Sequence, residues 1–112
     1  MNCRATGLLA WSVQRASAAY MLLFVMAVLG AMSLNPVHGY PQWRAWVASP
    51  VMTVAIAVFF ASLLAHLWVG LRDVLLDYAR PAGLRRFMLA AVAAVLVGMG
   101  LWVILILVRV QA

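Results

Sequence analysis

The chain has 112 residues, of which 69% are hydrophobic and 9% are charged, and its mean hydropathy is +1.09. A soluble domain of this size carries about 25% charged residues, so this composition excludes a water-exposed globular surface and indicates a protein embedded in a lipid bilayer. The net charge of +6 comes from arginines that flank the apolar runs, which indicates membrane orientation and no nucleic-acid partner. The single cysteine, Cys3, excludes an internal disulfide and an all-cysteine metal site.

Three apolar runs cover residues 16–34, 51–71 and 87–108, about 19, 21 and 22 residues long. As helices they reach about 28–33 Å, which matches a hydrocarbon core of ~30 Å. All four prolines lie in the connecting segments, and none of the runs shows the alternating polarity of a β-barrel strand. We therefore predict an all-α membrane protein with one domain over residues 1–112. Its three transmembrane helices are expected at about 16–34, 51–79 and 87–108.

The first run could instead be a cleaved signal peptide with a processing site at residues 31–33, but it is longer than the usual 7–15 apolar residues. In the third run, small residues at four-residue spacing predict a close helix contact: Ala90, Ala94 and Gly98.

Arginine placement predicts the orientation of the three helices. Six arginines lie in the N-terminal segment and in the second connection, whereas only Arg44 and Arg109 lie on the opposite side. Positive residues favour the cytoplasmic side, so the N-terminus is predicted to be cytoplasmic and the C-terminus periplasmic. Four tryptophans at or near the expected interfaces fit an anchoring role: Trp11, Trp43, Trp46 and Trp102.

The second predicted helix carries the polar residues that point to chemistry. His66 lies inside the apolar run, where an unpaired polar group costs several kcal/mol, so its imidazole needs a partner. Gly70, one turn later, leaves room beside the imidazole for a flat bulky group or a neighbouring helix. A spacing of about 100° per residue places four polar residues on one face: Ser62, His66, Asp73 and Asp77.

Haem is the natural candidate for a membrane histidine, because histidine is a common axial ligand of its iron. The other histidine, His38, follows the first run on the opposite side, so a second axial ligand would come from another chain. The sequence contains no Gly-rich nucleotide turn and no nucleophile–base pair, so electrons would arrive from partner subunits. A hydrophobic acceptor at the membrane edge near Asp77 and Tyr78 would be quinone-like.

Simpler interpretations of the same residues remain open. His66 can serve as a hydrogen-bonding residue between helices, and Tyr78 can be a member of an interfacial aromatic belt. The two aspartates can form interfacial ion pairs with Arg72 and Arg80.

Three segments together resemble the second transmembrane helix of the hydrophobic membrane-anchor subunit of bacterial succinate dehydrogenase, of the smaller D-type. They are His66-Leu67-Trp68-Val69-Gly70, Val74-Leu75-Leu76-Asp77-Tyr78 and Arg80-Pro81. The start of the first span, Arg15-Ala16-Ser17-Ala18, also resembles the family. The Asp77-Tyr78 pair favours the D-type over the C-type anchor.

The resemblance implies a non-catalytic subunit of succinate:quinone oxidoreductase (respiratory complex II), which links the tricarboxylic acid cycle to the respiratory chain in the bacterial inner membrane. It implies pairing with a cytochrome b556-type C subunit, and attachment of the flavoprotein and iron–sulfur subunits on the cytoplasmic face. It also admits a trimer of this heterotetramer.

The same resemblance implies roles for individual residues. His66 would be one axial ligand of the iron of haem b, which is shared with the C subunit. Tyr78 would hydrogen-bond ubiquinone, Asp77 would support that site, and Arg15 would contact a haem propionate or the quinone site. Arg72 and Asp73 depart from a better-known relative, which has uncharged residues there, and this departure changes the electrostatics of the quinone approach.

Two alternatives accompany this prediction. The first is a C-type or fumarate-reductase anchor. The second is a small three-span structural protein of the holin kind, which would leave the face shared by His66 and Asp77 unexplained.

Overall fold

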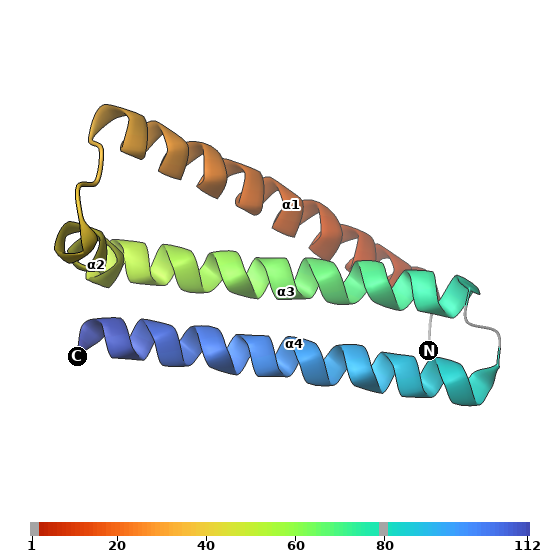
Figure 1. The fold of residues 1–112 in the computed structure, drawn as a ribbon. Helices are drawn as coiled ribbons and strands as arrows, with labels where there is room; N and C mark the ends of the chain where they lie inside the picture. Colours follow the sequence, from red (N-terminus) through yellow and green to blue (C-terminus); the bar gives the residue numbers. More distant parts are fainter. Residues whose placement is uncertain (1–2, 79–80) are drawn as a thin grey trace.

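The computed structural model describes residues 3–78 and 81–112, which form four helices (Figure 1). Their bounds are α1, Cys3–Leu34; α2, Tyr40–Ala48; α3, Pro50–Tyr78; and α4, Ala82–Gln111. Three of them, α1, α3 and α4, are long and apolar enough to cross a membrane. The prediction of an all-α protein with three spans is confirmed.

The long helices extend beyond the apolar runs from which they were predicted. The first begins at Cys3 rather than at residue 16, and α4 begins at Ala82 rather than at residue 87. With 32 residues, α1 is about 48 Å long at ~1.5 Å per residue, which exceeds a hydrocarbon core of ~30 Å. The helical backbone therefore continues beyond the apolar run, into a segment that mixes apolar and polar side chains.

The first connection contains a helix, α2, that the sequence analysis did not predict. It follows Gly39, whose φ of 84° lies in the left-handed region that glycine adopts without strain. Pro41 lies in the first turn, where its missing amide donor is not needed. The rings of Trp43 and Trp46 lie one turn apart with centroids separated by 5.5 Å, and Val47 is buried. The connection is thus a short packed helix and not an extended linker.

The long helices are arranged with α3 in the middle. It packs against α1 on one side and α4 on the other, whereas α1 and α4 make no close backbone contact with each other in the described ranges. Figure 1 shows α1 diverging from α3 toward the end of the molecule where α2 lies. The start of α1, the end of α3 and the start of α4 lie at the opposite end from α2 and the C-terminus of α4.

Polar contacts join α3 and α4 at the α2 end. Gln111 donates from Nε2 to Oγ1 of Thr53 at 2.8 Å, and Thr53 in turn donates to the carbonyl of Val47 at 2.9 Å. Arg44 of α2 donates to the carbonyl of Ala112. These contacts fix the C-terminal end of α4 against the start of α3.

Close contact between α3 and α4 does not use the predicted stripe of small residues. Ala90, Ala94 and Gly98 are exposed on this chain, and a Cβ added at Gly98 would have no heavy atom within 4 Å. The close approach lies at Gly100, where an added Cβ would lie 3.3 Å from Cδ1 of Leu64. Within the chain, α4 therefore presents a different face to α3, and the close contact predicted for the stripe is not made by α3.

Candidate functional site

His66 lies in the middle third of α3, a continuous helix from Pro50 to Tyr78. It precedes Tyr78 by twelve residues, or about 18 Å along the axis at ~1.5 Å per residue. The unbroken helix preserves the spacing that places His66 and Asp77 on one face. The histidine is half-buried, and its neighbour is α1.

The partner of the imidazole is Ser17 of α1. The Oγ of Ser17 lies 3.1 Å from Nδ1 of His66 and 3.1 Å from the carbonyl oxygen of Gln14. Ser17 is only 6% exposed, the one buried polar residue in the part of the chain that the structure describes. Buried polar groups require hydrogen bonds, so this contact holds α1 and α3 at a fixed register.

The second ring nitrogen of His66 is not used by this contact. Within residues 7–78 and 81–112, whose side chains the structure describes, Nε2 has no hydrogen-bond partner, and it is not among the buried polar atoms that lack one. The imidazole thus has one edge fixed by α1 and one edge available. Helix–helix hydrogen bonding and metal ligation, two alternatives at the level of sequence, use different nitrogens and are compatible in this geometry.

The space beside Gly70 is occupied by α1. A Cβ added at Gly70 would lie 3.6 Å from Nε2 of Gln14, which is an ordinary van der Waals distance. Of the two expectations for this glycine, a flat bulky group or a neighbouring helix, the chain itself provides the helix. Oε1 of Gln14 is buried without a hydrogen-bond partner among the described residues.

Asp77 and Tyr78 form the last residues of α3. Both are exposed, and Tyr78 is 80% exposed, so its phenol is accessible at the end of the helix. One turn earlier, Nε of Arg72 lies 3.9 Å from Oδ1 of Asp73, with the two side chains 39% and 56% exposed. An exposed pair at this distance contributes little to stability. Arg80, the other proposed partner of the aspartates, lies outside the described residues.

Arg15 is not brought to His66. It is exposed, and its guanidinium carbon lies 5.5 Å from the ring centroid of Trp11 on the preceding turn. Ser17, which does contact His66, follows two residues later, about 200° around the helix. Arg15 therefore lies on the side of α1 that faces away from α3, and its predicted role requires a ligand or a partner on that outer side.

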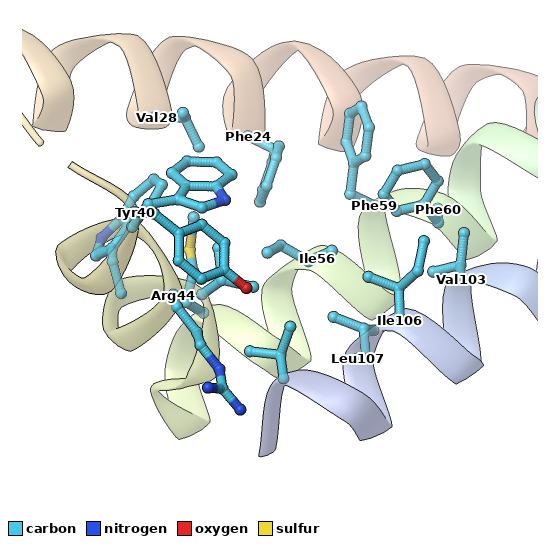
Figure 2. A pocket seen from close by; sticks show the side chains of 15 residues that line it. Phe24, Val28, Tyr40, Arg44, Ile56, Phe59, Phe60, Val103, Ile106 and Leu107 are labelled. Atoms are coloured by element: carbon cyan, nitrogen blue, oxygen red, sulfur yellow. The ribbon is translucent and has the colours of Figure 1, made fainter. Parts of the chain in front are cut away.

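A separate cavity of about 410 Å³ lies at the α2 end of the molecule (Figure 2). The stacked rings of Phe24 and Phe59, with centroids 4.6 Å apart, lie on its α1 side, and Ile106 and Leu107 lie on its α4 side. The guanidinium of Arg44 points away from these rings toward the chain end that it hydrogen-bonds. Neither Ser17 nor His66 lines the cavity, which is therefore distinct from the surroundings of the histidine.

Sequence reasoning missed Ser17 and Gln14 as members of this cluster. The sequence did contain a signal for them, namely a hydroxyl and a side-chain amide in the first half of α1, because polar side chains within a membrane span need hydrogen-bond partners. In the part of the chain that the structure describes, no three His, Cys, Asp or Glu side chains gather as a metal-binding group.

The architecture defines a multi-pass membrane protein with three apolar spans and a part-buried contact between Ser17 of α1 and His66 of α3. Residues 3–101 match the family described as the succinate dehydrogenase/fumarate reductase transmembrane subunit. The chain therefore belongs to this family. It is 28% identical over 94 residues to the succinate dehydrogenase hydrophobic membrane anchor subunit of Coxiella burnetii, covering 84% of this chain and 82% of that relative.

Family membership confirms the resemblance seen in the sequence, and places the chain in the bacterial inner membrane as a multi-pass anchor subunit. It also favours the anchor prediction over the holin-like alternative. The family description covers both succinate dehydrogenases and fumarate reductases.

Proposed function

We propose that the chain is the D-type anchor of a succinate:quinone oxidoreductase and supplies His66 as one axial ligand of haem b. The proposal rests on the hydrogen bonding of the His66 imidazole. Its Nδ1 contacts Oγ of Ser17, whereas its Nε2 has no hydrogen-bond partner among the described side chains. Ligating histidines commonly make such a hydrogen bond through the nitrogen that does not bind the metal. The residues present therefore fit a haem ligand.

The proposal includes a shared site. A six-coordinate haem needs two axial ligands, and the second would come from a cytochrome b556-type C subunit. The flavoprotein and iron–sulfur subunits would dock on the cytoplasmic face, at the end of the molecule that holds the start of α1 and the end of α3. When bound, haem b would supply a one-electron carrier within the membrane.

Asp77 and Tyr78 are proposed to form part of the ubiquinone site at that same end. Reduction of a quinone to a quinol takes up two electrons and two protons, so a hydrogen-bond donor and a protonatable group are both required beside it. The exposed phenol of Tyr78 can donate to a quinone carbonyl, and the carboxylate of Asp77 can accept and release a proton. Their position at the end of α3 leaves both accessible to a ligand bound against partner subunits.

The haem ligand is tested by a reduced-minus-oxidised optical spectrum of the purified complex with wild-type chain and with His66→Ala. We expect a b-type absorption band in the wild type and its loss in the variant. His38→Ala is the matched control, since it removes an exposed histidine from the connection before α2. A band that survives in His66→Ala would refute the assignment of the ligand.

The quinone site is tested by Tyr78→Phe, which removes only the phenolic hydroxyl. We expect succinate-to-ubiquinone turnover to fall by about tenfold, because one hydrogen bond of roughly 1.4 kcal/mol corresponds to that factor. The haem spectrum should not change. Tyr40→Phe, at the opposite end of the molecule, is the matched control, and equal turnover of the two variants would contradict the assignment.

A further inference from the structure

Ser17 has a hydrogen-bond arrangement that determines which nitrogen of His66 carries the proton. Its hydroxyl has one proton to donate and two lone pairs to accept with. The carbonyl oxygen of Gln14, 3.1 Å from Oγ, is purely an acceptor, so the serine proton is directed there. Oγ then faces Nδ1 of His66 at 3.1 Å with a lone pair and needs a donor.

Only one direction makes both of these contacts hydrogen bonds at the same time. Nδ1–H of His66 donates to Oγ of Ser17, and Oγ–H of Ser17 donates to the carbonyl of Gln14. A neutral imidazole has one N–H group, so with the proton on Nδ1 the lone pair lies on Nε2.

We propose that Ser17 is a positioning residue that holds His66 in the tautomer with a free Nε2 lone pair, and so prepares it to ligate iron. The inference rests on the proposed function, since it assigns Ser17 a role toward the same haem. Burial strengthens the argument, because Ser17 is 6% exposed and its hydroxyl has no access to bulk water that could substitute for either contact.

The proposal predicts a specific effect of removing the hydroxyl. Loss of a hydrogen-bonding partner behind a ligating histidine typically weakens metal binding by about 10- to 100-fold. An imidazole whose N–H lacks an acceptor is also a weaker electron donor, so the oxidised iron is stabilised less. We therefore expect Ser17→Ala to raise the midpoint potential of the haem and to accelerate haem loss from the complex.

The experiment compares the purified complex carrying wild-type chain, Ser17→Ala, Ser17→Thr and Ser33→Ala. Haem potential is measured by optical redox titration, and haem loss by transfer to excess apomyoglobin. Ser17→Thr keeps a hydroxyl and should restore wild-type values. Ser33→Ala is the matched control, because Ser33 makes the same kind of bond to a backbone carbonyl of α1, at 2.8 Å to Leu29, with an exposed side chain.

Two results would overturn the proposal. Unchanged potential and unchanged haem loss in Ser17→Ala would show that the hydroxyl does not act on the ligand. Equal defects in Ser17→Ala and Ser17→Thr would show that the position matters for packing and not for hydrogen bonding. Failure of the proposed function is seen separately, since the haem band would then survive in His66→Ala.

Discussion

Substitution of Gly70 by alanine tests the packing that positions the candidate site. The added Cβ would lie 3.6 Å from Nε2 of Gln14, an ordinary contact distance, and the backbone at Gly70 has no left-handed φ that a side chain would strain. The distance between α1 and this glycine therefore leaves enough room for a methyl group. We expect α1 and α3 to keep their register.

The expected change in the free energy of unfolding follows from two small terms. Alanine is more favourable than glycine in a helix interior by about 0.5–1 kcal/mol, and each new atom pair at contact distance adds about 0.1–0.2 kcal/mol. Gly70→Ala should thus stabilise the chain by about 0.5–1 kcal/mol. At Gly100 the gain should be smaller, because an added Cβ would lie 3.3 Å from Cδ1 of Leu64, which must shift.

The assay is unfolding of the full chain in mixed micelles by titration with sodium dodecyl sulfate, followed by circular dichroism. Gly98→Ala is the matched control, since an added Cβ there meets no heavy atom within 4 Å. The same Gly70→Ala variant in the purified complex should retain its haem band. Destabilisation by more than about 1 kcal/mol, or loss of the band, would refute the placement of α1 over Gly70.

Two further predictions concern contacts that hold the helices together. Tyr20→Phe removes the hydroxyl that donates to the carbonyl of Ala55 at 2.8 Å, and should cost about 0.5–1.5 kcal/mol in the same titration; an unchanged midpoint would show that this bond does not stabilise the α1–α3 pair. Thr53→Val removes the hydroxyl that joins Gln111 to the carbonyl of Val47, and should cost about 1–3 kcal/mol, with Thr53→Ser restoring most of the loss.

The three spans were predictable because a bilayer imposes a length on any apolar helix, and that length is readable from the sequence. The first and last residues of these helices were less predictable, because a helix can continue beyond its apolar run as long as its backbone hydrogen bonds are formed. The short helix α2 escaped prediction because its nine residues are stabilised by packing of Trp46 and Val47 against the bundle.

The candidate site was predictable on one helix and not between helices. Spacing along α3 related His66 to Asp77 and Tyr78, because one continuous helix fixes those positions. The contact between His66 and Ser17 depends on how α1 is aligned along α3. When both helices are apolar, the periodicity of their sequences contains little information about this alignment. For the same reason, the stripe of small residues in α4 did not indicate which face of that helix packs against α3.

The cavity between the diverging half of α1 and the other three helices has a practical consequence for handling the protein. Apolar cavities of this kind are not stabilised by water, so in a bilayer the natural filling is hydrocarbon from acyl chains. A detergent whose tails fit poorly there would leave the rings of Phe24 and Phe59 without neighbours on one side. The choice of detergent, and the lipid retained during extraction, would then determine whether the half of α1 near α2 keeps its position relative to the other helices.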